Sequence, residues 1–217
     1  MQVIDVSKLY SNNNSSNSFK RHKVFISCYY NEGGRYKDTL ESWNEQAGIF
    51  VNQSVQEYEI DDNLPDEEIR KIIRDYYIRD STVTIVLCGP DTRRRKFVDW
   101  ELHATMYDTQ KNPKGGILAI SLPCADNCEY AAPGDRYWVP NAYKYRDGHE
   151  QEWLEEHFPD IPDRLFWSIM DGVPITVVDW EDVYGHPEVL GNLIDSAYRR
   201  RKTNRYRMDI PLRRRNS

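Results

Sequence analysis

The sequence predicts an α/β fold in which a central parallel sheet is flanked by helices. Three short apolar segments carry this prediction, at residues 23–28, 82–87 and 116–122. Each is nearly continuous in β-branched and aliphatic residues, as expected of strands that are buried on both faces. Amphipathic helical segments alternate with them, which is typical of a parallel sheet. The 217 residues are enough for one domain with additions.

The first strand is followed by Asn31–Gly34, a segment that is predicted to end it. A helix is then expected over residues 35–48, followed by a short strand near residues 49–51. The helix is indicated by apolar residues at helical spacing: Tyr36, Leu40, Trp43 and Ala47.

A turn at residues 61–65 leads into the clearest helix of the chain, whose first turn is acidic and so complements the helix dipole. Its apolar stripe is Ile69, Ile72, Ile73 and Tyr76. The strand at residues 82–87 follows. A second helix is expected over residues 96–107, before the strand at residues 116–122.

The pattern changes after Leu122. Residues 123–172 are rich in Pro, Asp, Tyr and Trp, with a helix expected near residues 150–156. A final strand is predicted at residues 174–178 and a final helix at residues 188–200. The apolar face of this helix is predicted from Val189, Leu193, Ile194 and Ala197.

The net charge of −6 conceals an uneven distribution. Residues 199–217 hold nine basic side chains and one acidic one, whereas the rest of the chain holds 20 basic and 34 acidic ones. The acidic body makes nucleic acid an unexpected partner. We expect the basic tail to be solvated and to fold back on this body.

The polar residues 1–21 predict a flexible lead-in without an export signal. With no apolar stretch of membrane-spanning length, a cytoplasmic protein without membrane contact is expected.

Several common sites are disfavoured. The sequence has no dinucleotide-binding, Walker or nucleophile-elbow motif. Cys124 and Cys128 lack a second pair of ligands, so no metal site is expected.

Glu101 is the strongest candidate residue, because it lies on the helix that follows the central strand. In open α/β sheets, ligands bind outside the carboxyl ends of the strands. Phe97 is expected to share a helix face with Glu101, and Trp100 to point elsewhere.

These segments resemble the TIR-like domains of bacterial defence proteins, and especially the TIR-like component of Thoeris anti-phage systems. The resemblance covers about residues 23–122 and rests on four segments: His22–Tyr30, Asp66–Asp75, Asp80–Gly89 and Arg95–Leu102. It implies a flavodoxin-like TIR fold with an aromatic-rich insertion and an extra C-terminal strand and helix. The expected TIR-like domain spans residues 22–198, with a core at 23–122 and an elaboration at 123–198.

The resemblance also implies an activity. Such enzymes cleave NAD between nicotinamide and ribose, and Thoeris-type members make an ADP-ribose-derived signalling nucleotide, here expected to be cyclic. Glu101 matches the family's catalytic glutamate. NAD would be the substrate and no cofactor is implied. A phage-derived trigger, self-association and a downstream effector reached through the nucleotide are the implied partners. The expected substrate-binding residues are Ser27, Cys28, Tyr29, Tyr30, Asn31 and Phe97.

Two alternatives stay open. The first is a non-catalytic TIR-like adaptor or sensor that acts through protein–protein contacts, in which Glu101 only forms a helix-face salt bridge. The second concerns the aromatic residues of the insertion, which either form a lid over the site or pack on the sheet as a further layer. These residues are Tyr130, Tyr137, Trp138, Tyr143 and Tyr145.

Overall fold

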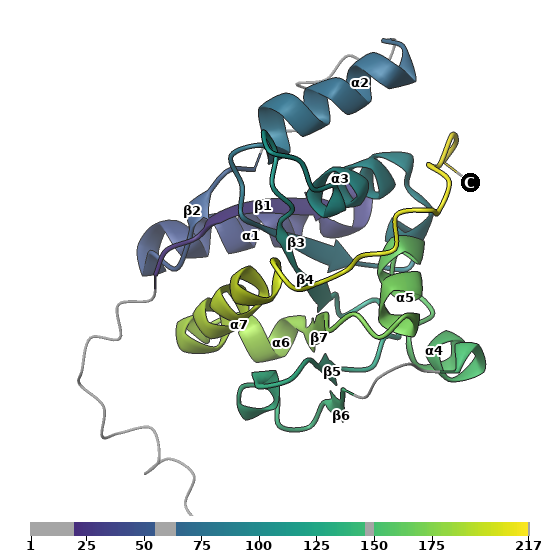
Figure 1. The fold of residues 1–217 in the computed structure, drawn as a ribbon. Helices are drawn as coiled ribbons and strands as arrows, with labels where there is room; N and C mark the ends of the chain where they lie inside the picture. Colours follow the sequence, from purple (N-terminus) through teal and green to yellow (C-terminus); the bar gives the residue numbers. More distant parts are fainter. Residues whose placement is uncertain (1–19, 55–63, 146–149, 217) are drawn as a thin grey trace, which may run out of the picture.

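The computed structural model describes residues 20–54, 64–145 and 150–216. The strands in this part of the chain form one sheet of seven, in the order β2-β1-β3-β4-β7-β5-β6 (Figure 1). Its first five strands are mutually parallel: β2 (Val51–Asn52), β1 (Lys23–Cys28), β3 (Val83–Cys88), β4 (Gly116–Ser121) and β7 (Thr176–Asp179). This order is the flavodoxin-like one, so the predicted α/β fold with a central parallel sheet is confirmed. The predicted lead-in and the turn at 61–65 lie mostly outside the described residues.

Helices cover both faces of the sheet (Figure 1). One face packs against α1 (Tyr30–Ala47), α6 (Trp180–Val183) and α7 (Pro187–Arg200). The other face packs against α2 (Asp66–Ile72), α3 (Lys96–Met106), α4 (Gln151–His157) and α5 (Asp163–Met170). Alternation along β1 sets this division, because Val24 and Ile26 join the first layer and Phe25 joins the second.

The first strand ends before Asn31, as predicted, but the expected start of the next helix is wrong: α1 begins at Tyr30, so Asn31–Gly34 are helical. Gly33 lies directly against β1, where an added Cβ would approach the Cβ of Cys28 to 2.7 Å. The two glycines are buried inside the first turns of the helix. Gly33 allows the close approach of helix and strand, and Gly34 leaves room for the Tyr30 ring, so neither glycine interrupts the helix.

The buried face of α1 also differs from the prediction at its end. Ala47 is exposed, and the polar Asn44 is buried instead. The Asn44 side chain accepts hydrogen bonds from the backbone N–H groups of Ile49 and Phe50 and donates to the Phe50 carbonyl. These bonds hold the chain as it turns toward β2, which begins two residues later than expected.

The predicted apolar stripe of the next helix is wrong at Tyr76, whose exposed fraction is 78%. Beyond Ile72 the helix continues as a π-helix, η2 (Ile73–Ile78). A π-helix bonds residues five apart, so it delays the return of a side chain to the same face. Ile69, Ile73 and Ile78 are therefore the residues buried against the sheet.

The insertion extends the sheet at the edge far from β1. β5 (Tyr130–Ala131) pairs antiparallel with β7, and β6 (Tyr143–Lys144) pairs parallel with β5. Tyr130 is fully buried in the layer that contains α4 and α5. Four strand spacings, about 19 Å, separate β5 from β1. This position favours the packing alternative for Tyr130.

The predicted helix near 150–156 is present as α4, whereas α5, β5 and β6 were not predicted.

The C-terminal strap, residues 201–216, runs in extended form from α7 past α5 to α3 (Figure 1). It folds back on the body, as expected, but it is partly buried. Asn204 and Tyr206 are buried, and the Tyr206 hydroxyl donates to the Gly115 carbonyl at 3.1 Å. The indole N–H of Trp100 donates to the Arg213 carbonyl at 2.9 Å. The strap is thus an integral part of the packed structure.

Candidate functional site

The candidate site lies where the order of the sheet reverses. β1 is followed along the chain by β2 on one side and by β3 on the other, so the crevice outside their carboxyl ends is the switch point of the fold. Ser27, near the end of β1, and Glu101, on the helix after β3, both lie beside this point.

Ser27 is the polar member of an otherwise apolar row across the sheet. Its neighbours in register are Val86, Ala119 and Val177. The Ser27 side chain is 1% exposed, and its hydroxyl donates to a Glu101 carboxylate oxygen at 2.5 Å. A buried hydroxyl needs such a partner, and a carboxylate is a strong acceptor. The bond therefore fixes the Glu101 side chain against the end of β1.

Burial raises the pKa of Glu101 from 4.5 to about 7. The Ser27 hydrogen bond and the nearby positive charge of Lys37 oppose this change, because both favour the ionised carboxylate. Within the described residues, no lysine or arginine forms an ion pair with Glu101 inside 4 Å. The arrangement differs from the helix-face salt bridge that the adaptor alternative requires.

Glu32, in the first turn of α1, fixes the loop that precedes α3. Its carboxylate accepts hydrogen bonds from the backbone N–H groups of Asp91 at 2.8 Å and Thr92 at 3.1 Å. Gly89 leaves room for this contact, because a Cβ there would lie 2.6 Å from a Glu32 oxygen. Glu32 thereby ties the carboxyl ends of β1 and β3 to each other.

Tyr29 and Asn31 lie together at the start of α1. The Asn31 amide donates to the Tyr29 hydroxyl at 2.7 Å. The guanidinium of Arg95 lies 3.6 Å from the centre of the Tyr29 ring and also pairs with Asp91 at 3.1 Å. Its buried Nε has no hydrogen-bond partner among the described residues. A cation with an unused donor therefore borders the Tyr29–Asn31 segment.

The other expected substrate-binding residues occupy varied settings. Tyr30 is 45% exposed, and its ring lies over Gly34. Cys28 is half-buried against α1. Phe97 contacts the Trp100 ring edge-to-face, with centroids 5.5 Å apart, in the layer that contains α2. The expectation that Phe97 lies on the Glu101 face of the helix and apart from Trp100 is therefore wrong, because Phe97 packs with Trp100.

Glu32, Lys37 and Arg95 were not identified from the sequence. The helix was expected to begin near residue 35. The sequence therefore did not show that Glu32 lies in the first turn of α1, or which face of this helix carries Lys37 toward the site. Arg95 stands among three consecutive arginines, Arg93–Arg95, and the sequence does not distinguish the one that contacts Tyr29.

No group of three or more His, Cys, Asp or Glu side chains is placed to hold a metal ion within the described ranges. Cys124 and Cys128 are free thiols, Cys124 exposed and Cys128 half-buried. Each helix in the described part of the chain is too short or too polar to cross a membrane.

Comparison with known proteins agrees with this architecture. Residues 25–127 match the family model described as Thoeris protein ThsB, TIR-like domain. No curated protein matches the chain. The matched segment begins within β1 and ends beyond β4, so it contains Ser27, Glu32 and Glu101. Residues 25–127 of this chain are therefore similar to the TIR-like domain of the Thoeris protein ThsB.

Proposed function

We propose that the protein cleaves the nicotinamide–ribose bond of NAD and that Glu101 is its essential residue. The observation that carries the proposal is the Ser27–Glu101 pair at the carboxyl ends of β1 and β3. A half-buried carboxylate beside the switch point of an open sheet is well placed for a nucleotide substrate. The similarity of residues 25–127 to a TIR-like family model supports the same reaction.

The proposed reaction breaks the bond between C1′ of the ribose and the pyridinium nitrogen. The bonding electron pair leaves with nicotinamide, which departs as a neutral molecule and needs no proton from an acid. Positive charge develops on the ribose C1′ and ring oxygen, as in glycoside cleavage. An ionised Glu101 beside the ribose stabilises this charge, and its low-polarity setting strengthens the interaction.

The neighbouring residues have supporting roles in this proposal. Ser27 orients the carboxylate through its hydrogen bond. The exposed ring of Tyr30 supplies a stacking surface for a base. Arg95 and Lys37 are cations close to this edge, and they compensate locally for the negative body when an anionic dinucleotide binds.

We propose an ADP-ribose-derived signalling nucleotide as the product, and a cyclic isomer in particular. Cyclisation requires that a group of the same molecule reaches C1′ before water does. The partly closed setting of Glu101 supports this outcome, because exclusion of water suppresses hydrolysis. In this proposal a phage-derived component triggers the reaction, and the nucleotide then reaches an effector.

The test measures nicotinamide released from NAD by the purified protein, with and without extract from phage-infected cells. We expect turnover by the wild type and a loss of at least 100-fold in Glu101→Gln. Glu45→Gln on exposed α1 surface is the matched control and should retain full activity. Mass spectrometry of the same reactions separates cyclic from linear ADP-ribose.

Equal turnover by Glu101→Gln and the wild type would overturn the role of Glu101. No turnover by the wild type under phage-triggered conditions would overturn the proposed reaction and favour the adaptor.

A further inference from the structure

A groove of about 310 Å³ lies on another flank of α3, between α2, η2 and the C-terminal strap. Its α3 wall consists of Trp100, His103 and Ala104 of the helix, at positions i, i+3 and i+4, together with Tyr107, the residue that caps its C-terminus. Successive residues of a helix are turned by about 100°, so Glu101 projects from a different side of α3. The groove is therefore separate from the Ser27–Glu101 pair.

The opposite wall carries charge at the same helical spacing. It is formed by Glu67, Arg70, Lys71 and Arg74. Arg70 pairs with Glu67 at 2.9 Å, and Arg74 pairs with Asp75 at 2.7 Å. Lys71 is exposed and forms no ion pair within 4 Å in the described part of the chain. The positive charges of Arg70, Lys71 and Arg74 outnumber the negative charges of Glu67 and Asp75. The net charge of this wall is therefore positive, although the net charge of the protein is negative.

The α3 wall offers ring surfaces. Tyr107 is 44% exposed, and its ring stacks on His103 with centroids 5.8 Å apart. Burial lowers the pKa of His103, and the positive charges of Arg164, Arg70 and Arg74 lower it further, against the opposing effect of Asp99. The histidine therefore experiences an excess of positive charge.

We propose that this groove binds a nucleoside phosphate, with the base against the rings of α3 and the phosphates against the cations of α2 and η2. The volume lies near the lower end of the range for small-molecule sites, about 300–1,000 Å³, which suits one nucleotide. Rings on one wall and cations on the other match a ligand that is flat at one end and anionic at the other. The strap contributes Leu212 to the lining of the groove.

The site does not depend on the proposed NAD cleavage, and its test uses binding alone. ADP, adenosine and inorganic pyrophosphate are titrated into the full chain by calorimetry. We expect ADP to bind at least tenfold more tightly than either fragment, because only ADP engages both walls. Lys71→Glu and Tyr107→Ser should each weaken ADP binding at least fivefold.

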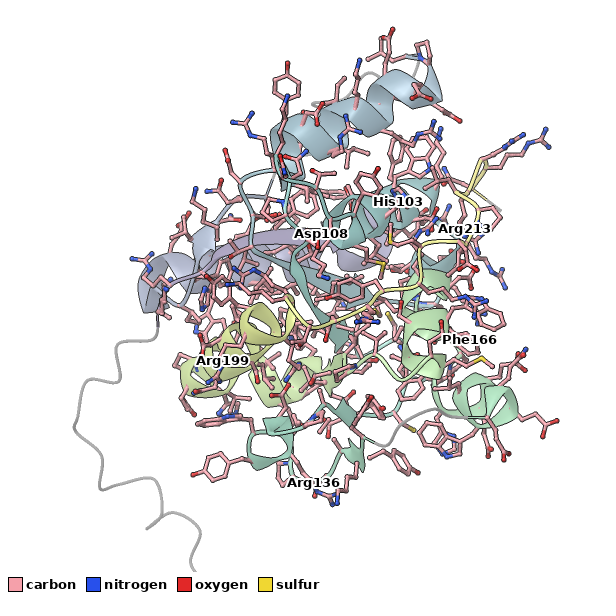
Figure 2. All side chains as sticks on the ribbon, viewed as in Figure 1. His103, Asp108, Arg136, Phe166, Arg199 and Arg213 are labelled. Carbon is pink, nitrogen blue, oxygen red and sulfur yellow. The ribbon has the colours of Figure 1, made fainter. Side chains whose placement is uncertain are left out.

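Matched controls come from the opposite end of the molecule. Figure 2 shows Arg136 far from His103, and both Arg136 and Tyr137 are exposed. Arg136→Glu makes the same charge change as Lys71→Glu, and Tyr137→Ser removes the same ring as Tyr107→Ser. Both controls should bind ADP within twofold of the wild type. All four positions are at the surface, so folding is not at risk.

A second readout places the ligand. Bound phosphate adds negative charge near His103, so ADP should raise the pKa of this ring in an NMR titration, with the His103 signal assigned by its loss in His103→Asn. The proposal is overturned if ADP binds no better than pyrophosphate, or if the groove variants and their controls bind equally. It is also overturned if Lys71→Glu changes the sedimentation coefficient and leaves ADP affinity unchanged, which would assign the groove to self-association.

Discussion

Glu101 lies in a low-polarity setting that its hydrogen bond to Ser27 only partly offsets. Its pKa of about 7 therefore makes the ionised form sensitive to pH near neutrality. Two consequences can be measured, one on activity and one on stability.

The rate of NAD cleavage should rise as pH increases through about 7, because the proposed mechanism uses the ionised carboxylate. Ser27→Ala removes the hydrogen bond that favours ionisation, so the midpoint should move to higher pH. Its rate should be several-fold below wild type at pH 7 and approach wild type at pH 9. The measurement is a kcat/KM profile from pH 5 to 9. A reduced rate with an unchanged midpoint would contradict this role for Ser27.

Stability should show the complementary effect. Between pH 4.5 and about 7 the folded protein holds the Glu101 proton more tightly than the unfolded chain, so the Glu101 contribution is lost as pH rises. Glu101→Gln avoids this loss, and its stability relative to wild type should increase from pH 5 to pH 8 by at most about 3 kcal/mol. Urea unfolding at both pH values measures the difference.

Glu129, whose pKa is raised to about 8 by burial and by its hydrogen bond to Asp182, is present in both proteins. Its contribution therefore cancels in this comparison. A constant difference between Glu101→Gln and wild type across the pH range would contradict the raised pKa.

At the scale of elements, the loop between β3 and α3 depends on α1. Glu32→Gln replaces one acceptor oxygen by an amide that faces N–H donors of Asp91 and Thr92. We expect a loss of about 1–3 kcal/mol in the free energy of unfolding, together with a lower kcat/KM. Chemical denaturation measures the first effect, and the Glu45→Gln control should show neither. If Glu32→Gln matches this control, the loop does not depend on the contact.

The elements that were predicted well are those whose local pattern agrees with their tertiary setting. β1, β3 and β4 are continuous apolar strands because helices bury both of their faces. The start of α1 was missed because glycine usually favours a turn. Gly33 instead lets α1 pack closely against Cys28 of β1. This contact is between two elements, so the local sequence does not indicate it.

At the scale of the whole molecule, the C-terminal strap connects α7, α5 and α3. Arg164 on α5 is fully buried, pairs with Asp99 on α3 at 2.6 Å and donates to the carbonyls of Ile210 and Pro211. The backbone N–H of Arg213 donates to Asp99 at 2.8 Å. Main-chain groups of the strap thus complete a buried ion pair.

Removal of residues 205–217 should destabilise the protein by about 2–5 kcal/mol, since Arg164 loses acceptors inside the structure. The control is Arg214→Gln with Arg215→Gln, which removes charge from exposed positions and keeps the strap. It should unfold at the same urea concentration as the wild type. A truncated chain as stable as the control would show that the strap is dispensable.

The sequence alone determined the parallel sheet, its covering helices and the candidate Glu101, because these depend on hydrophobic periodicity and on residue order along the chain. It did not determine the π-helical shift that exposes Tyr76 or the buried course of the basic strap. Nor did it indicate that Glu32 and Lys37 join Ser27 and Glu101 at one end of the sheet. Those features depend on which distant groups approach each other once the core is packed, and only the tertiary structure decides such contacts.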